Sequence, residues 1–426
     1  MATPPASAWS NPNFRRLWRA SAAATLGAEI GEIALPLLAL VTLAASAAEA
    51  SVLRIAQFLP FLLATLPVGV LVDRLHRRRL RLMVGADLGR AILMVLIALG
   101  AWAGLVGMPA LTALVFVAAV LTVFYQVADF AMLPSVVEPA QIVDANGRLA
   151  ATQSAAEISG RGVGGLLVQA LSAPVAVLLN AVGYLLSALS LRRIRLVDQA
   201  TPGDEAPPRG SAWRDALGGV GVTLRHRIIR PLLGEATTFN LANEVFLLGL
   251  LLYAVREAHL GPAVIGAVFT AGGLGSFVGA WFGARMTARY GYGRVLLVAL
   301  VIGNGAALGV LAANQVGRAV PALLAGVFLL MGLGIGVANV HAVSLRQTAV
   351  PLGLRGRVNA AYRLVSWGAI PVGAAAGGLV ATGAGPFVAM CSGAVGIALA
   401  TVWVAWSGVP RLRSIQDAAQ DESAGE

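Results

Sequence analysis

Residues 51–102 read SVLRIAQFLPFLLATLPVGVLVDRLHRRRLRLMVGADLGRAILMVLIALGAW, two apolar runs on either side of a short segment dense in arginine. Each run has about 20 residues, which is the length that an α-helix needs to cross a hydrocarbon core roughly 30 Å thick. The arginines between them belong in water or among lipid headgroups. The stretch therefore predicts two transmembrane helices joined by a short, positively charged loop.

The same pattern continues through the whole chain of 426 residues, of which 58% are hydrophobic and only 12% charged. A soluble domain carries about twice that share of charge. Twelve apolar runs are long enough to span a membrane. They cover residues 17–43, 51–72, 82–104, 110–133, 147–171, 174–192, 231–255, 263–284, 295–313, 321–344, 358–381 and 386–407. The fifth and eleventh runs are polar enough for a hydropathy window to miss them. We expect an all-α integral membrane protein with twelve transmembrane helices.

Several kinds of chemistry find no support in the composition. All 31 basic residues are arginine, so a phosphate-binding loop with its lysine and a lysine Schiff base are both excluded. Cys391 is the only cysteine, and the four histidines lack the spacing of a metal site. We expect no metal, no cofactor and no enzymatic activity. A membrane enzyme would need a catalytic cluster at the membrane surface, and none is visible.

The arginines also predict the orientation of the chain. They cluster around 15–19, 74–81, 192–195, 209–230, 285–294, 346–357 and 411–413, whereas the opposite connectors hold only Arg54, Arg256 and Arg318. This asymmetry indicates that both termini are cytoplasmic, and it explains the net charge of +11 without nucleic acid as a partner. We predict a bundle at 1–194, a cytoplasmic linker at 195–230, a second bundle at 231–410 and a cytoplasmic tail at 411–426.

The two halves resemble each other in sequence. Asn146, Gly160, Gly164 and Gly165 are followed 213 residues later by Asn359, Gly373, Gly377 and Gly378. This offset makes the fifth and eleventh runs equivalent and predicts two pseudo-symmetric six-helix bundles. Parallel repeats of this kind are typical of transporters with a substrate site between their halves. The glycines would also let neighbouring helices approach closely.

The loop GVLVDRLHRRRL at 69–80 resembles the G-x-L-x-D-R-x-G-R-R/K signature of the major facilitator superfamily. Six residues match this pattern, namely Gly69, Leu71, Asp73, Arg74, Arg77 and Arg78. The resemblance implies that all of them except Leu71 form a conformational latch on the cytoplasmic side. Gly69 would permit a tight helix contact, and Asp73 would face the positive end of a helix. His76 stands where the pattern usually has glycine.

Other stretches are similar to the efflux branch of this superfamily that includes macrolide exporters and the enterobactin exporter. They include MLPSVVEPAQIVDANGRL and SLRQTAVPLGLRGRVNAAYRLVSWGAIPVGAAAGG. The resemblance implies a multi-pass protein of the bacterial inner membrane, a monomer that acts in efflux and multidrug resistance. In the fifth run, ISGRGVGG carries Arg161 where related exporters usually have proline, so the antiporter role of that motif does not transfer directly.

Two carboxylates interrupt the first run, TLGAEIGEIALPLLAL at 25–40. Glu29 and Glu32 share one helical face, and charge at that depth costs about 2.5–3.5 kcal/mol, so both should face the protein interior or water. Pro36 removes the usual partner of the Glu32 carbonyl and should bend the helix. Desolvation and mutual repulsion favour proton uptake by these carboxylates. Proton coupling, binding of a cationic substrate, and an ion pair with Arg161 or Arg363 all remain open.

Other acidic side chains have partners nearby in the sequence. Asp87 and Arg90 lie three residues apart, and Glu157 and Arg161 lie four apart, so each pair can neutralise itself within one helix. Glu157 remains a third candidate for proton coupling. The Asp87 pair is interpreted as structural.

Further residues qualify as the wall of a substrate cavity because they are polar or aromatic within apolar runs. They are Glu244, Asn243, Arg161, Tyr125, Phe246 and Trp367. The sequence thus predicts a secondary transporter that exports a bulky amphipathic small molecule, such as an antibiotic, a siderophore or a secondary metabolite, in exchange for protons by alternating access. An importer or a lipid-moving carrier of the same fold is the alternative.

Overall fold

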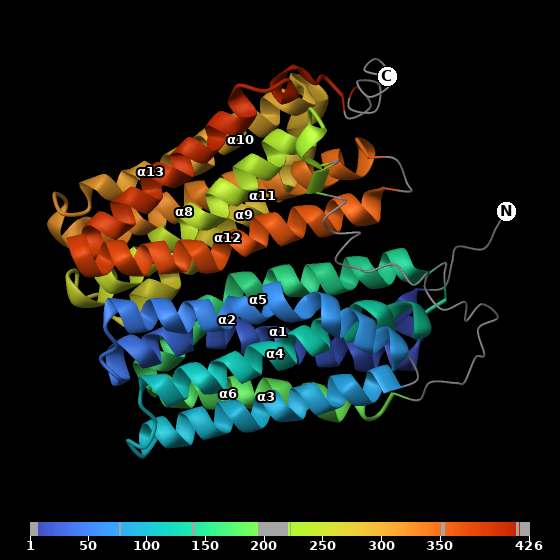
Figure 1. Cartoon of the computed structure of the whole chain (residues 1–426), viewed down its shortest axis with the longest axis vertical. Helices are drawn as coiled ribbons and strands as arrows, with labels where there is room; N and C mark the ends of the chain where they lie inside the picture. Colours follow the sequence, from blue (N-terminus) through green and yellow to red (C-terminus); the bar gives the residue numbers. More distant parts are fainter. Residues whose placement is uncertain are drawn as a thin grey trace. The chain divides into compact units, whose positions relative to one another are not determined.

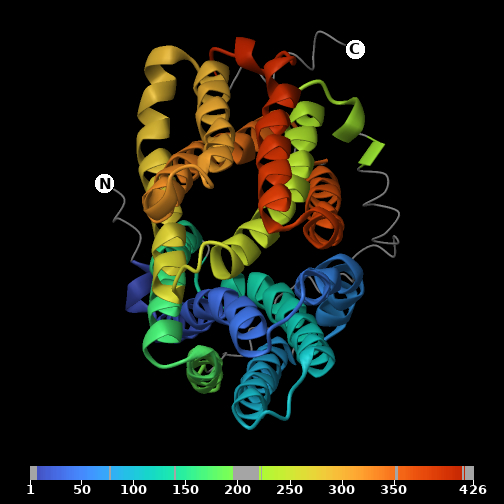
Figure 2. The same cartoon turned by 90° about the vertical axis from the view of Figure 1, so that its left-hand side faces the viewer.

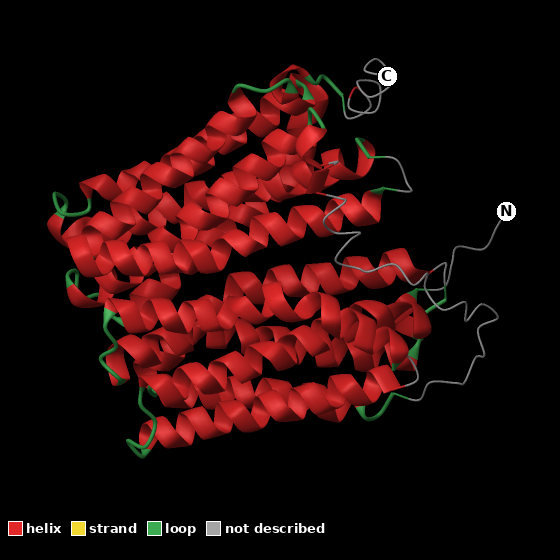
Figure 3. Ribbon diagram, viewed as in Figure 1, coloured by secondary structure: helices red, strands yellow, loops and turns green. Residues whose placement is uncertain are grey.

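The computed structural model describes residues 7–75, 78–138, 141–194, 220–221, 223–350, 354–414 and 417, and within these ranges the chain is helical with no strand (Figure 3). Two compact units are present. Unit 1 comprises Met1–Ala44 and Ala56–Arg209, and unit 2 comprises Ala45–Ile55 and Gly210–Glu426. Twelve long helices are found in the described part of the chain, which confirms the predicted number (Figure 1).

The helices of the first half follow the predicted runs closely. They are α1 (Pro12–Leu37), α2 (Ala47–Arg74), α3 (Arg79–Trp102), α4 (Met108–Met132), α5 (Ile142–Ala170) and α6 (Ala173–Leu191). Within unit 1, α1 packs against α5 and α6, and α3 packs against α4 and α6. Short loops join these helices, as expected for neighbouring antiparallel spans.

The second half repeats this arrangement within unit 2. Its helices are α8 (Ile229–Arg256), α9 (Pro262–Tyr290), α10 (Tyr292–Ala306), α11 (Val320–Thr348), α12 (Arg355–Ala384) and α13 (Pro386–Ala405). Here α8 packs against α12 and α13, and α10 packs against α11 and α13. Figure 2 shows the helices of each unit nearer to end-on. The first helix of each unit therefore has equivalent neighbours, α5 and α6 or α12 and α13.

Eleven described helices are long and apolar enough to cross a membrane, and α5 is the long helix that misses this criterion. The sequence predicted such a failure for the fifth and eleventh runs. It occurs only in the fifth, because α5 carries Asp144, Arg148, Glu157 and Arg161 along its length. Its equivalence to α12, which does meet the criterion, identifies it as a membrane helix.

The glycines of the internal repeat have the same structural role in both units. A Cβ atom on Gly164 of α5 would lie 3.1 Å from the Ile30 carbonyl oxygen of α1. A Cβ atom on Gly377 of α12 would lie 3.0 Å from the Val245 Cα atom of α8. Close packing at these positions therefore needs glycine, as the sequence predicted.

Two local features were not predicted from the sequence. Helix α1 continues through Pro36 to Leu37, and a π-helical turn follows at Leu38–Thr42. The first turns of α2 group with unit 2 and not with the first half, because Ala45–Ile55 packs among helices of that unit. Ser51 Oγ donates a hydrogen bond of 2.8 Å to the Ala374 carbonyl of α12, and Arg256 donates one to the Ala45 carbonyl.

Candidate functional site

The most distinctive polar contact of unit 1 joins α1 to α5. Arg161 Nε donates a hydrogen bond of 3.0 Å to Glu29 Oε2, and the two form an ion pair. Gly160, beside Arg161, has room only for a hydrogen atom against Glu29, so the two helices meet closely at this level. The Glu29 side chain is 17% exposed and that of Arg161 35%, so the pair is partly open and not sealed in a core.

This ion pair is one of the alternatives that the sequence left open for Glu29. Arg161 extends across to α1, whereas the sequence paired it with Glu157 inside α5. Glu157 instead accepts a hydrogen bond of 3.1 Å from Gln153 Nε2 on the exposed side of α5. Glu32 lies half-buried one turn beyond Glu29 on the same helix. Arg161, Glu32 and Glu157 thus all lie close enough to Glu29 to interact with it electrostatically.

Unit 2 holds a second ion pair that the sequence did not predict. Arg54 of α2 binds Glu244 of α8 through two contacts, Nε to Oε2 at 2.8 Å and Nη2 to Oε1 at 3.1 Å. Glu244 is buried, and a bidentate pair holds both groups in one geometry. The available signal was Arg54 itself, since an arginine within an apolar run requires a partner. Asn243, the neighbouring cavity candidate, is half-buried.

The aromatic cavity candidates lie in different surroundings. Phe246 is fully buried, 6.0 Å from Phe328 between ring centroids, so it belongs to the core of unit 2 and not to a cavity wall. Tyr125 is buried beside Arg90, so it belongs to the core of unit 1 and not to a cavity wall. Trp367 alone keeps an exposed ring, over which the Arg363 guanidinium lies 4.4 Å from the centroid. Burial of Tyr125 and Phe246 reflects the need of large rings for packing partners.

The predicted latch is only partly described. Asp73 and Arg74 belong to the last turn of α2, Arg78 is exposed just before α3, and Arg77 lies outside the described residues. A Cβ atom on Gly69 would meet open space, so the tight helix contact expected there is absent from the described structure. The role of these residues stays a prediction.

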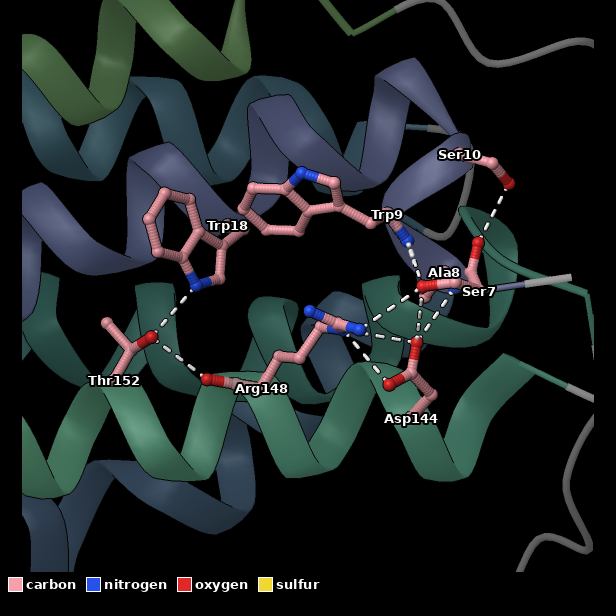
Figure 4. A network of polar contacts seen from close by, with 8 residues as sticks. All are labelled: Ser7, Ala8, Trp9, Ser10, Trp18, Asp144, Arg148 and Thr152. Carbon is pink, nitrogen blue, oxygen red and sulfur yellow. Dashed lines mark hydrogen bonds and ion pairs between the residues drawn. The ribbon is translucent and has the colours of Figure 1, made fainter.

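A polar network fastens the start of the chain to α5 (Figure 4). Asp144, which precedes the predicted membrane span of this helix, accepts hydrogen bonds from the Ala8 N–H at 2.9 Å and from Arg148 Nε at 3.0 Å. These contacts, first of all the one from Arg148, hold the pKa of Asp144 below its usual range. One turn further, Trp18 Nε1 donates to Thr152 Oγ1 at 2.8 Å. The network fixes α1 and α5 against each other at one end, while Glu29 and Arg161 join them further along.

Among the described residues, no three histidine, cysteine or acidic side chains gather where they could hold a metal ion. Two six-helix units of equivalent packing, with ion pairs between the first helix of a unit and a neighbour, define the chain as a multi-pass membrane transporter of the class built from two repeats.

Comparison with known proteins agrees with this class. Residues 17–374 match the Major Facilitator Superfamily, so the chain belongs to this family of transporters and is not an enzyme. The multidrug efflux pump Tap of Mycolicibacterium fortuitum is 29% identical over 391 residues, which cover 88% of this chain and 90% of Tap. The uncharacterised transporter YkuC of Bacillus subtilis is 23% identical over 248 residues, 56% of each chain.

Solved structures confirm the fold. A bacterial homologue of the iron transporter ferroportin, in its inward-facing state, superposes with a TM-score of 0.67 at 18% identity, covering 92% of this chain and 98% of the homologue. The nucleoside transporter NupG gives a TM-score of 0.69 at 12% identity, covering 92% of this chain and 97% of NupG. The chain is therefore a major facilitator that moves a small molecule across a lipid bilayer.

Proposed function

We propose that this transporter exports a bulky amphipathic small molecule in exchange for protons, by alternating access, as a monomer in the bacterial inner membrane with both termini cytoplasmic. The observation that carries the proposal is the partly open ion pair of Glu29 and Arg161. The similarity of the chain to Tap, a multidrug efflux pump by name, supports export as the direction of transport. The substrate class remains that of antibiotics, siderophores or secondary metabolites.

The Glu29 carboxylate suits a coupling role because its charge has a specific partner. While Glu29 is ionised, Arg161 is held by it at 3.0 Å. A proton on Glu29 removes the negative charge and converts an ion pair into a weaker contact. The guanidinium then becomes available to water or to an acceptor on the substrate. Return of Arg161 to Glu29 favours loss of the proton, so proton transfer and substrate binding oppose each other, as exchange requires.

Glu32 and the remaining cavity candidates have supporting roles in the proposal. Glu32 lies one helical turn from Glu29 and offers the next acceptor for the proton. Asn243 and Trp367 are the cavity candidates with accessible surface in unit 2, and they suit a substrate that is partly polar and partly aromatic. Glu244 is held by Arg54, so it is a weaker candidate for direct binding.

The test uses everted membrane vesicles with an acidic interior, to which macrolides, siderophores and cationic dyes are added one at a time. Export appears as substrate accumulation in the vesicles together with proton release from them. We expect Glu29→Gln to abolish substrate-evoked proton release while a labelled substrate still binds. Glu257→Gln is the matched control, because Glu257 is exposed in the connector after α8.

Two outcomes would contradict the proposal. Proton release undiminished in a Glu29→Gln, Glu32→Gln double variant would remove both glutamates from the coupling route and direct attention to Glu157 or Glu244. Substrate lost from preloaded vesicles, without accumulation in empty ones, would indicate an importer or another kind of carrier.

A further inference from the structure

A cavity of about 800 Å³ lies in unit 2 between the beginning of α8 and the end of α13, far along the chain from Glu29. These two helices pack against each other, and they run in opposite directions past the cavity (Figure 1). Arg227 and Arg230 line it from the α8 side, and Trp403 and Trp406 line it from the α13 side. Nothing in the proposed transport cycle uses this cavity.

The cavity is basic at one end. Arg227 and Arg230 are both exposed, and among the described lining residues there is no carboxylate to balance them. Arg227 precedes α8 and Arg230 lies in its first turn, within the arginine cluster at 209–230 that the positive-inside rule assigns to the cytoplasmic side. Basic pockets between transmembrane helices on that side of a membrane suit anionic lipid headgroups. The charge of the lining thus favours an anion.

The other end of the cavity is apolar. Leu399 and Val402 line it from α13, and Leu399 precedes Trp406 by two turns, or about 10 Å along the helix. Leu399 is 57% exposed and Trp406 88% exposed, both on the outer surface of the bundle. A ligand in this space therefore meets arginine at one end and hydrocarbon at the other. That gradient matches a phospholipid and not a free phosphate ion.

The tryptophans place the cavity at the depth where headgroups meet acyl chains. Trp and Tyr side chains concentrate at the membrane interface, where an apolar ring can keep its N–H in polar surroundings. Trp403 Nε1 donates a hydrogen bond of 3.0 Å to Thr238 Oγ1 across the two helices. Gly234 of α8 leaves room for the indole, since a Cβ atom there would come within 2.5 Å of the ring. Trp403 is thus fixed as a wall of the cavity.

We infer that this cavity binds an anionic phospholipid of the leaflet that borders the arginine-rich side, with the lipid phosphate between Arg227 and Arg230 and an acyl chain along Leu399 and Val402. The site is independent of the direction and substrate of transport. Each arginine near a lipid headgroup contributes roughly a fivefold change in affinity, so the pair is expected to contribute about 30-fold.

Native mass spectrometry of the full chain tests the inference. The protein is reconstituted in vesicles with equal parts of phosphatidylglycerol and phosphatidylcholine, extracted, and examined for bound lipid. We expect the wild type to retain phosphatidylglycerol in preference, and the Arg227→Gln, Arg230→Gln variant to lose about 30-fold in apparent affinity. Arg225→Gln is the matched control, an exposed arginine two residues away that does not line the cavity. It should bind as the wild type does.

A second measurement places the lipid at the tryptophans and does not depend on survival of the double variant. Phosphatidylglycerol with brominated acyl chains should quench the tryptophan fluorescence of the wild type more than phosphatidylcholine with the same chains does. Trp406→Phe should reduce this difference between the two lipids. If the Arg227→Gln, Arg230→Gln variant retained as much phosphatidylglycerol as the wild type and the Arg225→Gln control, the inference would be overturned. Retention of inorganic phosphate without phosphatidylglycerol would also overturn it, since the site would then belong to a free anion.

Discussion

At the scale of single residues, Arg90 shows how unit 1 buries a charge. Its guanidinium lies 4.4 Å from the ring centroid of Tyr125 and 4.2 Å from that of Tyr184, and it forms an ion pair with Asp87 on its own helix. Both charged side chains are almost fully buried. The sequence correctly paired these two residues by their spacing. The aromatic rings on either side come from α4 and α6, and only the fold reveals them.

Removal of one partner from this pair should destabilise unit 1 strongly. Arg90→Met leaves the Asp87 charge buried without compensation, so we expect a loss of about 3–5 kcal/mol in the free energy of unfolding in detergent. The Asp87→Asn, Arg90→Met double variant should lose less, because no unpaired charge remains. Unfolding curves of the three proteins measure the difference.

The control for this experiment is Asp129→Asn. Asp129 is a second carboxyl that repels Asp87 and attracts Arg90, so its neutralisation removes two opposing interactions and keeps both members of the central pair. We expect little change in stability. Equal losses for the single Arg90→Met and the double variant would show that the arginine acts by packing between the rings and not by its charge.

At the scale of elements, the two units use glycine to bring their long helices together. Gly373 of α12 lies against the Leu241 carbonyl of α8, as Gly160 of α5 lies against Glu29 of α1. The two glycines are 213 residues apart, the offset found in the sequence. Close helix approach is thus a property of the repeat, and in unit 1 it also brings Arg161 within reach of Glu29.

Gly373→Ala is expected to disturb α12 more than its size suggests. The added methyl group collides with backbone atoms of α8, which cannot rotate away, so we expect a loss of about 1–3 kcal/mol. Gly383→Ala on the same helix meets open space and should be neutral, or stabilising by up to about 1 kcal/mol. The midpoints of thermal unfolding of the two variants test this prediction. Equal midpoints would contradict close packing at Gly373.

At the scale of the whole molecule, the distribution of arginine predicts the orientation in the membrane. The prediction is tested in a Cys391→Ser background, which removes the single native cysteine. Ser10→Cys reports on the N-terminal side, and Gln315→Cys reports on the exposed connector before α11. A membrane-impermeant maleimide added to intact cells should label Gln315→Cys at once and Ser10→Cys only after permeabilisation. The reverse labelling would refute cytoplasmic termini.

The helical architecture follows from the amino-acid sequence. The number of spans and their bounds follow from hydrocarbon thickness, which sets the length of every apolar run, and from the absence of water, which leaves helices as the way to satisfy the backbone. Even α5, too polar for hydropathy alone, was identified by its length and its repeat partner. The close packing at Gly164 and Gly377 also followed from the sequence, because small residues recur where helices of a repeat meet.

The contacts between side chains of different helices become known only from the folded structure. From the sequence, Glu157 was as good a partner for Arg161 as Glu29, and Arg54 had no evident partner. Phe246 was as suitable for a cavity wall as Trp367, yet it is fully buried. Local spacing determines contacts within one helix. Contacts between helices depend on how far each helix rotates and slides as its glycines and large side chains pack, and no local pattern encodes that geometry.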